Sequence, residues 1–336
     1  MRYRERESGP LGIMMTVAVA GLAVCGCLSC ERNVGSSGVL VRTVPVSDRL
    51  LSTSGWLGLV EQPPNPAPAS KACAFLGTDR VAFVPKSDTH RLTVCTRDNG
   101  TVLASWAWGP EWYLHHMARS RKGEYVVVCL SEELTLTGNY RRESCRVGVV
   151  GPKERIHWVG PIAFGQSGTS PRCTVVSDDG ETFAIVGPGG SDEVQVWSTK
   201  EGKMLWRDVP KGESGMEDIA FSPDGRTLYA GGTSGWVYAY EASSGRVTMR
   251  VLASRESKPV YGYRVSKVDV SPDGTLVAAG TGPDGDVYVW DTKTGKLVVV
   301  ISSKGSTVSD LAFSPDSCEI VVGGGMRMAL DVWRIR

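Results

Sequence analysis

Short apolar and β-branched runs, separated by polar turn residues, recur through the C-terminal half of the chain. Residues 271–295 show the pattern most clearly, because a Ser-Pro-Asp-Gly turn at 271–274 precedes the apolar run 276–280. A second turn then leads to the apolar and aromatic run 287–290, and a third turn closes at 294–295. Proline, aspartate and glycine each suit a particular position of a tight turn. Apolar runs joined in this way predict short antiparallel strands.

This unit appears three times, and once more in a weaker form. Residues 216–225, 265–274 and 308–317 read MEDIAFSPDG, VSKVDVSPDG and VSDLAFSPDS. Each is followed by a run of small apolar residues and then by a strand that ends in an aromatic residue. With the weaker copy near residue 177 included, these marker aromatics are Trp197, Tyr240, Trp290 and Trp333. Their spacing of 43, 50 and 43 residues is close to the period of roughly 40–45 residues that is typical of a propeller blade.

The repeat predicts an all-β fold, a β-propeller of six blades with four antiparallel strands in each. Helical repeats of similar length would need apolar residues every three to four positions, and these segments do not have them. Seven blades are the alternative, which would require residues 36–70 to form most of a blade although this stretch is short and rich in proline. The six expected blades span residues 71–106, 113–159, 171–208, 215–252, 263–302 and 306–336.

The last blade is short of an outer strand, because only three residues follow Trp333. An unpaired strand edge is a pairing site for other chains, and propellers protect their edges by closing the ring. We therefore expect an N-terminal strand from residues 39–60 to close the propeller. The predicted domains are a signal, lipoprotein or membrane-anchor segment at 1–30, a tether with the closing strand and a proline-rich link at 31–70, and the propeller at 71–336.

The repeated segments resemble the WD-repeat β-propeller family. The resemblance rests on residues 221–225 (FSPDG), on 313–316 (FSPD) and on 284–295, which contains the Trp-Asp dipeptide and a Thr-Gly turn. It covers residues 170–336 well, and 71–160 only through the spacing of the strands.

The sequence departs from the family pattern in two ways. One repeat carries the Trp-Asp dipeptide, and none carries the Gly-His dipeptide, since Gly305 is followed by Ser306. The hydrogen-bonded network that the family builds from that histidine, a turn aspartate and the strand tryptophan is therefore incomplete in every blade. The resemblance thus implies a divergent propeller, which we expect to be bacterial.

An uncharged run of 20 residues, 11–30, follows the arginines at positions 2, 4 and 6. Two membrane-related interpretations stay open. In the first, residues 24–27 (Val-Cys-Gly-Cys) resemble a lipoprotein cleavage site, with Cys27 as the lipidated residue and Cys30 as the alternative. In the second, the run remains as an uncleaved span. Both leave the propeller on the extracytoplasmic side, in the periplasm or cell envelope, and we favour the lipoprotein.

Composition and motifs argue against enzyme chemistry. The histidines stand at 90, 115, 116 and 157, and the adjacent pair should point to opposite faces of a strand, where they cannot easily share a metal. No metalloprotease, serine-hydrolase or phosphate-loop motif is present. We therefore predict no catalytic residue, no cofactor and no metal. The net charge of +1 shows no basic excess, so a nucleic-acid partner is not expected.

Two cysteines are candidates for a disulfide. Cys129 and Cys145 should lie on neighbouring strands of one blade, and an extracytoplasmic location would permit a bond between them. The alternative is that both are free thiols in the core, where cysteine behaves as a small apolar residue.

Three long insertions are expected on one face of the propeller, and long loops on a rigid scaffold often carry function. Aromatic and arginine side chains, which are enriched at binding hot spots, occur in all three. The alternative is that these are variable surface loops. The predicted partner-binding residues are Trp108, Trp112, Tyr113, Tyr140, Arg141, Arg142, Arg255, Lys258 and Tyr261.

These features predict a non-enzymatic scaffold, tethered to a membrane on its extracytoplasmic side, that binds a protein or peptide on the long-loop face. One alternative is a propeller enzyme of the lactonase or quinoprotein type. Another is a subunit of an envelope assembly complex. The fold does not decide among them, because propellers serve many functions.

Overall fold

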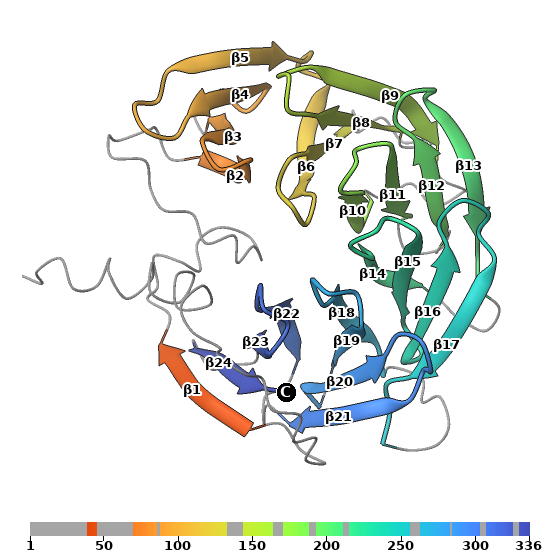
Figure 1. Ribbon diagram of the computed structural model, residues 1–336. Helices are drawn as coiled ribbons and strands as arrows, with labels where there is room; N and C mark the ends of the chain where they lie inside the picture. The colour runs from red at the N-terminus through yellow and green to blue at the C-terminus, as the bar shows by residue number, and fades with distance from the viewer. Residues whose placement is uncertain are drawn as a thin grey trace, which may run out of the picture.

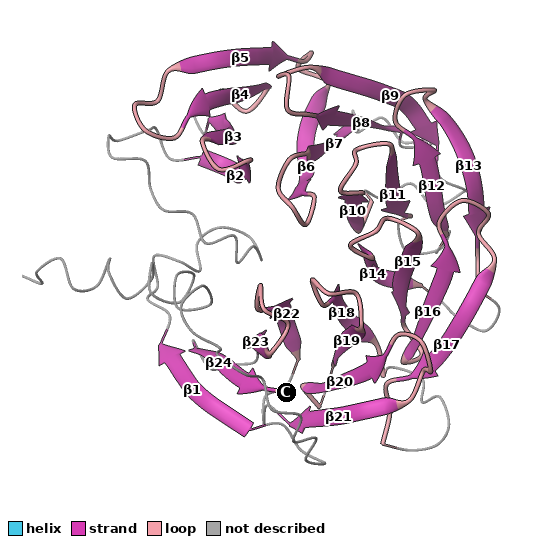
Figure 2. Ribbon diagram, viewed as in Figure 1, coloured by secondary structure: helices cyan, strands magenta, loops and turns pink. Residues whose placement is uncertain are grey.

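The described part of the chain is built from strands alone, with 24 strands and no helix (Figures 1 and 2). The computed structural model describes residues 39–45, 70–85, 88–132, 144–163, 171–187, 193–210, 215–255, 263–282, 284–302, 307–324 and 329–336. Within these residues, the prediction of an all-β fold is confirmed.

The strands form six antiparallel sheets of four strands each. The first sheet contains β2 (Ser70–Leu76), β3 (Arg80–Pro85), β4 (Arg91–Thr96) and β5 (Val102–Ala107). The second contains β6 (Trp112–Arg119), β7 (Val126–Glu132), β8 (Ser144–Val150) and β9 (Ile156–Ala163). The third contains β10 (Cys173–Val176), β11 (Thr182–Val186), β12 (Val194–Ser198) and β13 (Lys203–Asp208).

The remaining sheets repeat this plan. The fourth contains β14 (Met216–Phe221), β15 (Thr227–Gly232), β16 (Trp236–Glu241) and β17 (Val247–Leu252). The fifth contains β18 (Val265–Val270), β19 (Leu276–Thr281), β20 (Asp286–Asp291) and β21 (Leu297–Ser302). The sixth contains β22 (Val308–Phe313), β23 (Glu319–Gly324), β24 (Ala329–Arg334) and β1 (Val39–Pro45).

The six sheets are arranged around a common centre, as the blades of a propeller are (Figure 1). The innermost strands are β2, β6, β10, β14, β18 and β22, and the strand at the opposite edge of each sheet lies at the rim. The expected division into six blades therefore matches the six sheets of the described residues.

The N-terminal strand completes the last sheet. β1 pairs antiparallel with β24, with Leu40 opposite Trp333 and Pro45 opposite Ala329. This confirms that the N-terminal stretch supplies the outer strand that the C-terminal repeat is short of. The rest of the expected donor, residues 46–60, lies outside the described residues, and closure of the whole ring stays a prediction.

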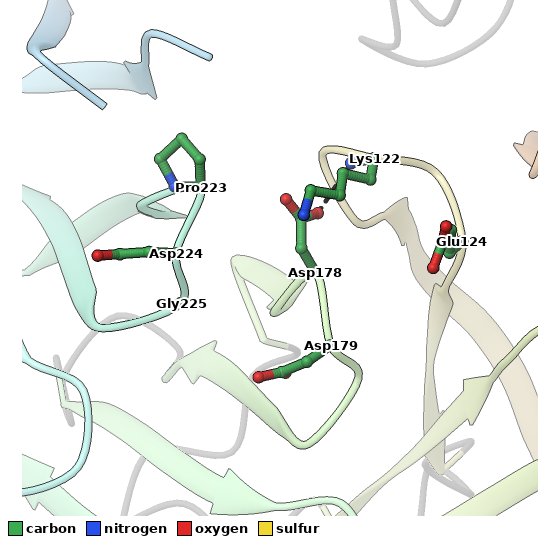
Figure 3. Close-up of a pocket in the computed structure, with 7 residues that line it drawn as sticks. All are labelled: Lys122, Glu124, Asp178, Asp179, Pro223, Asp224 and Gly225. Carbon is green, nitrogen blue, oxygen red and sulfur yellow. Dashed lines mark hydrogen bonds between the residues drawn. The ribbon is translucent and has the colours of Figure 1, made fainter. Parts of the chain in front are cut away.

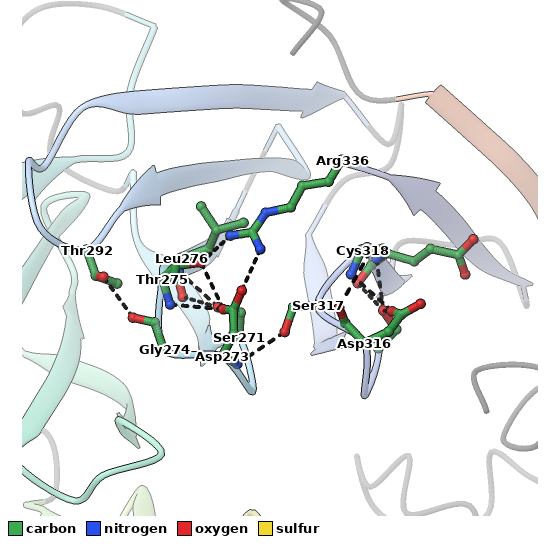
Figure 4. A network of polar contacts seen from close by, with 12 residues as sticks. Ser271, Asp273, Gly274, Thr275, Leu276, Thr292, Asp316, Ser317, Cys318 and Arg336 are labelled. Atoms are coloured by element: carbon green, nitrogen blue, oxygen red, sulfur yellow. Dashed lines mark hydrogen bonds and ion pairs between the residues drawn. The ribbon is translucent and has the colours of Figure 1, made fainter. Parts of the chain in front are cut away.

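A serine–aspartate turn repeats at the end of four consecutive innermost strands. In the fifth sheet, Ser271 Oγ donates to Asp273 Oδ1 at 2.6 Å and accepts the Leu276 N–H at 2.9 Å (Figure 4). Gly274 then takes a φ of +71°, which a residue with a side chain rarely adopts. The same Ser-to-Asp bond, 2.5 or 2.6 Å long, forms in the other three turns, at Ser177, Ser222 and Ser314.

Candidate protein-binding face

The propeller has two faces with different connections. Each innermost strand ends at a short turn such as 271–274, and we call that side the turn face. The links between successive sheets, and those between second and third strands, lie on the opposite side, which we call the loop face. The described strands that flank the three long insertions of the sequence have their adjoining ends on the loop face.

Trp108 and Trp112, two of the predicted partner-binding residues, pack beneath the loop face. Trp112 begins β6 and is buried in the core between the first and second sheets. The guanidinium of the exposed residue Arg146 lies over its ring, 4.6 Å from the centroid. Trp108 is half-buried and meets Trp158 edge to face, with centroids 6.4 Å apart. Trp112 therefore holds an exposed cation in place and offers little surface of its own.

Arg255 is fixed at the loop face by a buried carboxylate. Its Nε donates to Asp286 Oδ2 at 2.6 Å, and this bond raises the pKa of the arginine. The Arg255 side chain is 60% exposed, whereas that of Asp286 is 3% exposed. Next to this pair, Tyr263 donates a hydrogen bond to Asp284, and burial together with that bond raises the tyrosine pKa. The Arg255 guanidinium is thus oriented by the buried Asp286 and faces solvent.

Several sequence predictions fall outside the described residues. The partner-binding candidates Tyr140, Arg141, Arg142, Lys258 and Tyr261 do so, as does the side chain of Tyr113. The lipidation candidates Cys27 and Cys30 also lie outside the described part of the chain. All of them stay predictions.

Cys129 and Cys145 are both free thiols and not a disulfide, which is the alternative that the sequence left open. They share a hydrogen bond, and burial acts in the same direction to raise the pKa of Cys145 far above its usual range. The reason lies in the register, since Cys129 pairs with Val147 and Cys145 with Ser131. The two cysteines are therefore diagonal neighbours at roughly 7–8 Å, beyond the usual Cα separation of a disulfide.

The inner wall carries a titratable cluster that the sequence analysis missed. His116, Cys173, Asp218 and Lys267 lie on four consecutive innermost strands, each four residues before the first serine of its turn. Lys267 Nζ lies 3.9 Å from Asp218 Oδ1, while Asp218 Oδ2 accepts the Val268 N–H at 2.9 Å. Alignment of the chain on the turn serines was the signal that could have found this cluster.

The charges of this cluster favour a structural role. Burial, with the charge of Lys267 adding to it, lowers the pKa of His116 to about 4. Burial also raises the pKa of the Cys173 thiol well above its usual value, so the thiolate needed for nucleophilic attack is suppressed. Asp218 raises the pKa of Lys267. The cluster joins adjacent sheets, with a neutral histidine and a neutral thiol beside one ion pair.

A longer contact crosses the centre of the molecule. Arg121, in the turn between β6 and β7, forms an ion pair with Asp269 of β18. The second oxygen of Asp269 accepts the Phe313 N–H of β22 at 2.8 Å. Burial raises the pKa of Asp269, and the charge of Arg121 opposes that rise. This carboxylate therefore links the second, fifth and sixth sheets.

A pocket of about 320 Å³ opens between three turns of the turn face (Figure 3). The backbone N–H of Lys122 donates to Asp178 Oδ1 at 2.8 Å at its edge. The pocket lining consists of Lys122, Glu124, Asp178, Asp179, Pro223, Asp224 and Gly225. Its acidic side chains do not form a metal site, because no group of His, Cys, Asp and Glu residues with metal-binding geometry occurs among the described residues.

No helix that could cross a membrane is found in the described part of the chain.

Comparisons with known proteins find similarity to one repeat family and to two relatives. The family described as "WD domain, G-beta repeat" matches residues 257–291. The "Periodic tryptophan protein 2 homolog" of Dictyostelium discoideum is 27% identical over 141 residues, which are 41% of this chain and 14% of that protein. The "Protein LST8 homolog" of Drosophila melanogaster is 31% identical over 99 residues, 30% of this chain and 31% of that protein.

The solved structures add a match of the fold alone. A chain from a crystal structure of the mitotic checkpoint complex has a TM-score of 0.52 at 15% identity, with 93% of this chain and 95% of that chain covered. The present chain spans less than a third of the length of the two relatives it matches. The matched repeat, the relatives and the six sheets together support the interpretation of this molecule as a WD-repeat propeller.

Proposed function

We propose that this protein is a non-enzymatic scaffold that binds a protein or peptide on its loop face and is tethered to a membrane by its N-terminal segment. The observation that carries the binding role is the solvent-facing guanidinium of Arg255, held in one orientation by the buried Asp286. Arginine is enriched at binding hot spots, and a guanidinium that is already held in one orientation loses less conformational entropy on binding.

Two further points support a scaffold. A chain of this fold occurs in an assembly named a mitotic checkpoint complex, so the architecture serves in at least one multiprotein complex. The inner wall also favours binding over catalysis, since Cys173 is kept as a neutral thiol and Lys267 is paired with Asp218. The tether is supported by the uncharged run 11–30 and the lipoprotein-like residues 24–27.

The tether is tested by purifying the full-length protein from its native membrane beside a Cys27→Ala, Cys30→Ala variant. Mass spectrometry of the mature N-terminus should find a diacylglyceryl cysteine at position 27 or 30, and the variant should leave the membrane fraction. An intact N-terminus in a wild-type protein that is not membrane-bound would contradict the tether.

The binding role is tested in the same preparation. Proteins that co-purify with the wild type should be lost from an Arg255→Gln variant and kept by Arg246→Gln, a matched control whose exposed arginine pairs with Glu241 on the turn face. Equal recovery of the partner with both variants would remove Arg255 from the binding surface. Recovery of no partner at all would contradict the scaffold.

A further inference from the structure

Four exposed arginines of the described residues stand on the loop-face half of consecutive sheets, each held by a more buried side chain. Arg146 lies over Trp112 in the second sheet, and Arg207 pairs with Glu193 in the third, at 3.9 Å. In the fourth sheet, Arg250 stacks on Trp236, with 3.8 Å from the guanidinium carbon to the ring centroid. Arg255 follows that sheet and binds Asp286 of the fifth. We call these four residues the arginine arc.

The supports of three of these arginines occupy one repeated position. Glu193, Trp236 and Asp286 each stand four residues before the marker aromatic of their sheet, at the loop-face start of the third strand. The strand register confirms the equivalence. Arg207 lies opposite Gln195 and Arg250 opposite Tyr238, both two residues before the marker aromatic. A charged pair and a cation–π pair thus hold arginines at equivalent points of neighbouring sheets.

Stability alone is a poor explanation for these pairs. The carboxylates of Glu193 and Asp286 are buried, yet the side chains of Arg207 and Arg255 are 64% and 60% exposed. An exposed arginine gains little from such a pair, because water screens the charge and the long side chain loses freedom. In the third sheet, Gln195 donates to Glu193 at 2.5 Å and accepts from Trp197, which orients the carboxylate further. The hydrogen bond to Asp286 fixes the direction of the Arg255 guanidinium, and the charge of Glu193 attracts that of Arg207.

We infer that the arginine arc is a docking surface for an acidic segment of a partner protein. An exposed guanidinium recognises carboxylates with a planar fork of donors, and a fixed fork loses less entropy than a mobile one. The two aromatic supports, at Trp112 and Trp236, hold their arginines without neutralising them. The arc spans four sheets, so it suits an extended segment that contacts several blades.

The charge pattern favours protein over nucleic acid. Two of the four arginines already face a carboxylate, and the chain as a whole carries a net charge of only +1. Binding to a phosphate backbone usually depends on a dense basic stripe. Separate, individually oriented arginines match spaced glutamate and aspartate side chains better. This inference rests on the proposed protein-binding function and specifies the chemistry of the partner.

The test is fluorescence anisotropy with the full-length protein and a short labelled peptide of glutamate and serine. The critical variant is Arg146→Gln, Arg250→Gln, because both arginines lie on aromatic rings and their removal leaves no buried carboxylate unpaired. Its matched control is Arg246→Gln, Arg334→Gln, which removes the same charge from exposed turn-face arginines, 67% and 54% exposed. Thermal unfolding should show that both variants remain folded.

We expect the arc variant to lose affinity for the peptide by about tenfold or more, while the control stays close to the wild type. Affinity should also fall as salt rises to about 0.15 M. Equal loss in both variants, or equal binding of a glutamine–serine peptide, would overturn the inference. A single-stranded oligonucleotide that binds more tightly through the same two arginines would overturn it in favour of nucleic acid. If native partners co-purify with the arc variant as with the wild type, the scaffold stands and the acidic docking surface fails.

Discussion

At the scale of single residues, two glycines set how closely neighbouring sheets approach. A Cβ atom on Gly231 would lie 2.4 Å from Val265 Cγ1, and one on Gly280 would lie 2.5 Å from Val308 Cγ1. Each valine begins the innermost strand of the next sheet. The small-residue runs of the sequence therefore reflect contact between blades, since there is no room for a side chain at these points.

Gly231→Ala should lower the free energy of unfolding by about 1–3 kcal/mol, because overpacking a tight core forces side chains and backbone to shift. Chemical denaturation measures this change. Gly109→Ala is the matched control, since the atoms nearest to the added Cβ are those of the flexible carboxylate end of Glu111. Equal stability of the two variants would show that the fourth and fifth sheets can move apart without lowering the free energy of unfolding.

Asp273 should make stability depend on pH. Burial alone would raise its pKa, but hydrogen bonds from Ser271, Thr275 and Arg336 lower it well below the usual value. A lowered pKa in the folded state stabilises the protein above the unfolded pKa, about 3.9, and that contribution is lost as pH falls through the folded value. Asp273→Asn should therefore be less stable than the wild type from pH 7 to 5, with a difference that shrinks below about pH 4. A pH-independent difference in urea unfolding would contradict this.

At the scale of elements, turn chemistry and the alternation of apolar residues were enough to predict most strands. β9 shows where the sequence misled, because its expected end at residue 159 fell short of the observed Ala163. Pro161 argues against a strand interior, yet β9 is an outer strand and has one edge without a neighbour in its sheet. Proline is tolerated on such an edge because no ladder bond is lost there.

The pairing of β1 with β24 predicts the effect of a truncation. Removal of residues 1–46 should lower the melting temperature and promote aggregation, because the edge of β24 from Ala329 to Arg334 is then open to other chains. Removal of residues 1–37, which keeps β1, is the matched control. Differential scanning fluorimetry and light scattering measure both effects. If the two truncations behave alike, β1 contributes little to the sixth sheet.

At the scale of the whole molecule, the contacts across the centre could not be predicted from the sequence. Arg121 and Asp269 are separated by 148 residues, and Arg121 stands where three of the four serine–aspartate turns have proline. The inner-wall cluster was not recognised in the sequence either. Its repeated position holds His, Cys, Asp and Lys in turn, so a search for recurring residue types passes over it. Only the fold brings these four side chains to one wall.

Arg121→Gln should destabilise the molecule by roughly 1.5–3 kcal/mol, the usual contribution of a hydrogen bond to a charged group, because Asp269 loses its ionic partner. Hydrogen exchange should quicken at Phe313, whose N–H is bonded to the same carboxylate. Adding Asp269→Asn should recover part of the loss, since no unpaired charge then remains. Unchanged exchange in β22 would show that the contact does not couple the sheets.

The sixth sheet joins the earliest described strand to the last, and this has a consequence for the timing of biosynthesis. On the ribosome β1 is made first, but its partner β24 begins about 280 residues later. At a translation rate of about 5–20 residues per second, β1 waits roughly 15 to 60 seconds without a neighbour. The other five sheets are each contiguous in sequence and can assemble as they emerge. Completion of the sixth sheet therefore comes late in synthesis, and β1 stays without its partner while the other sheets assemble.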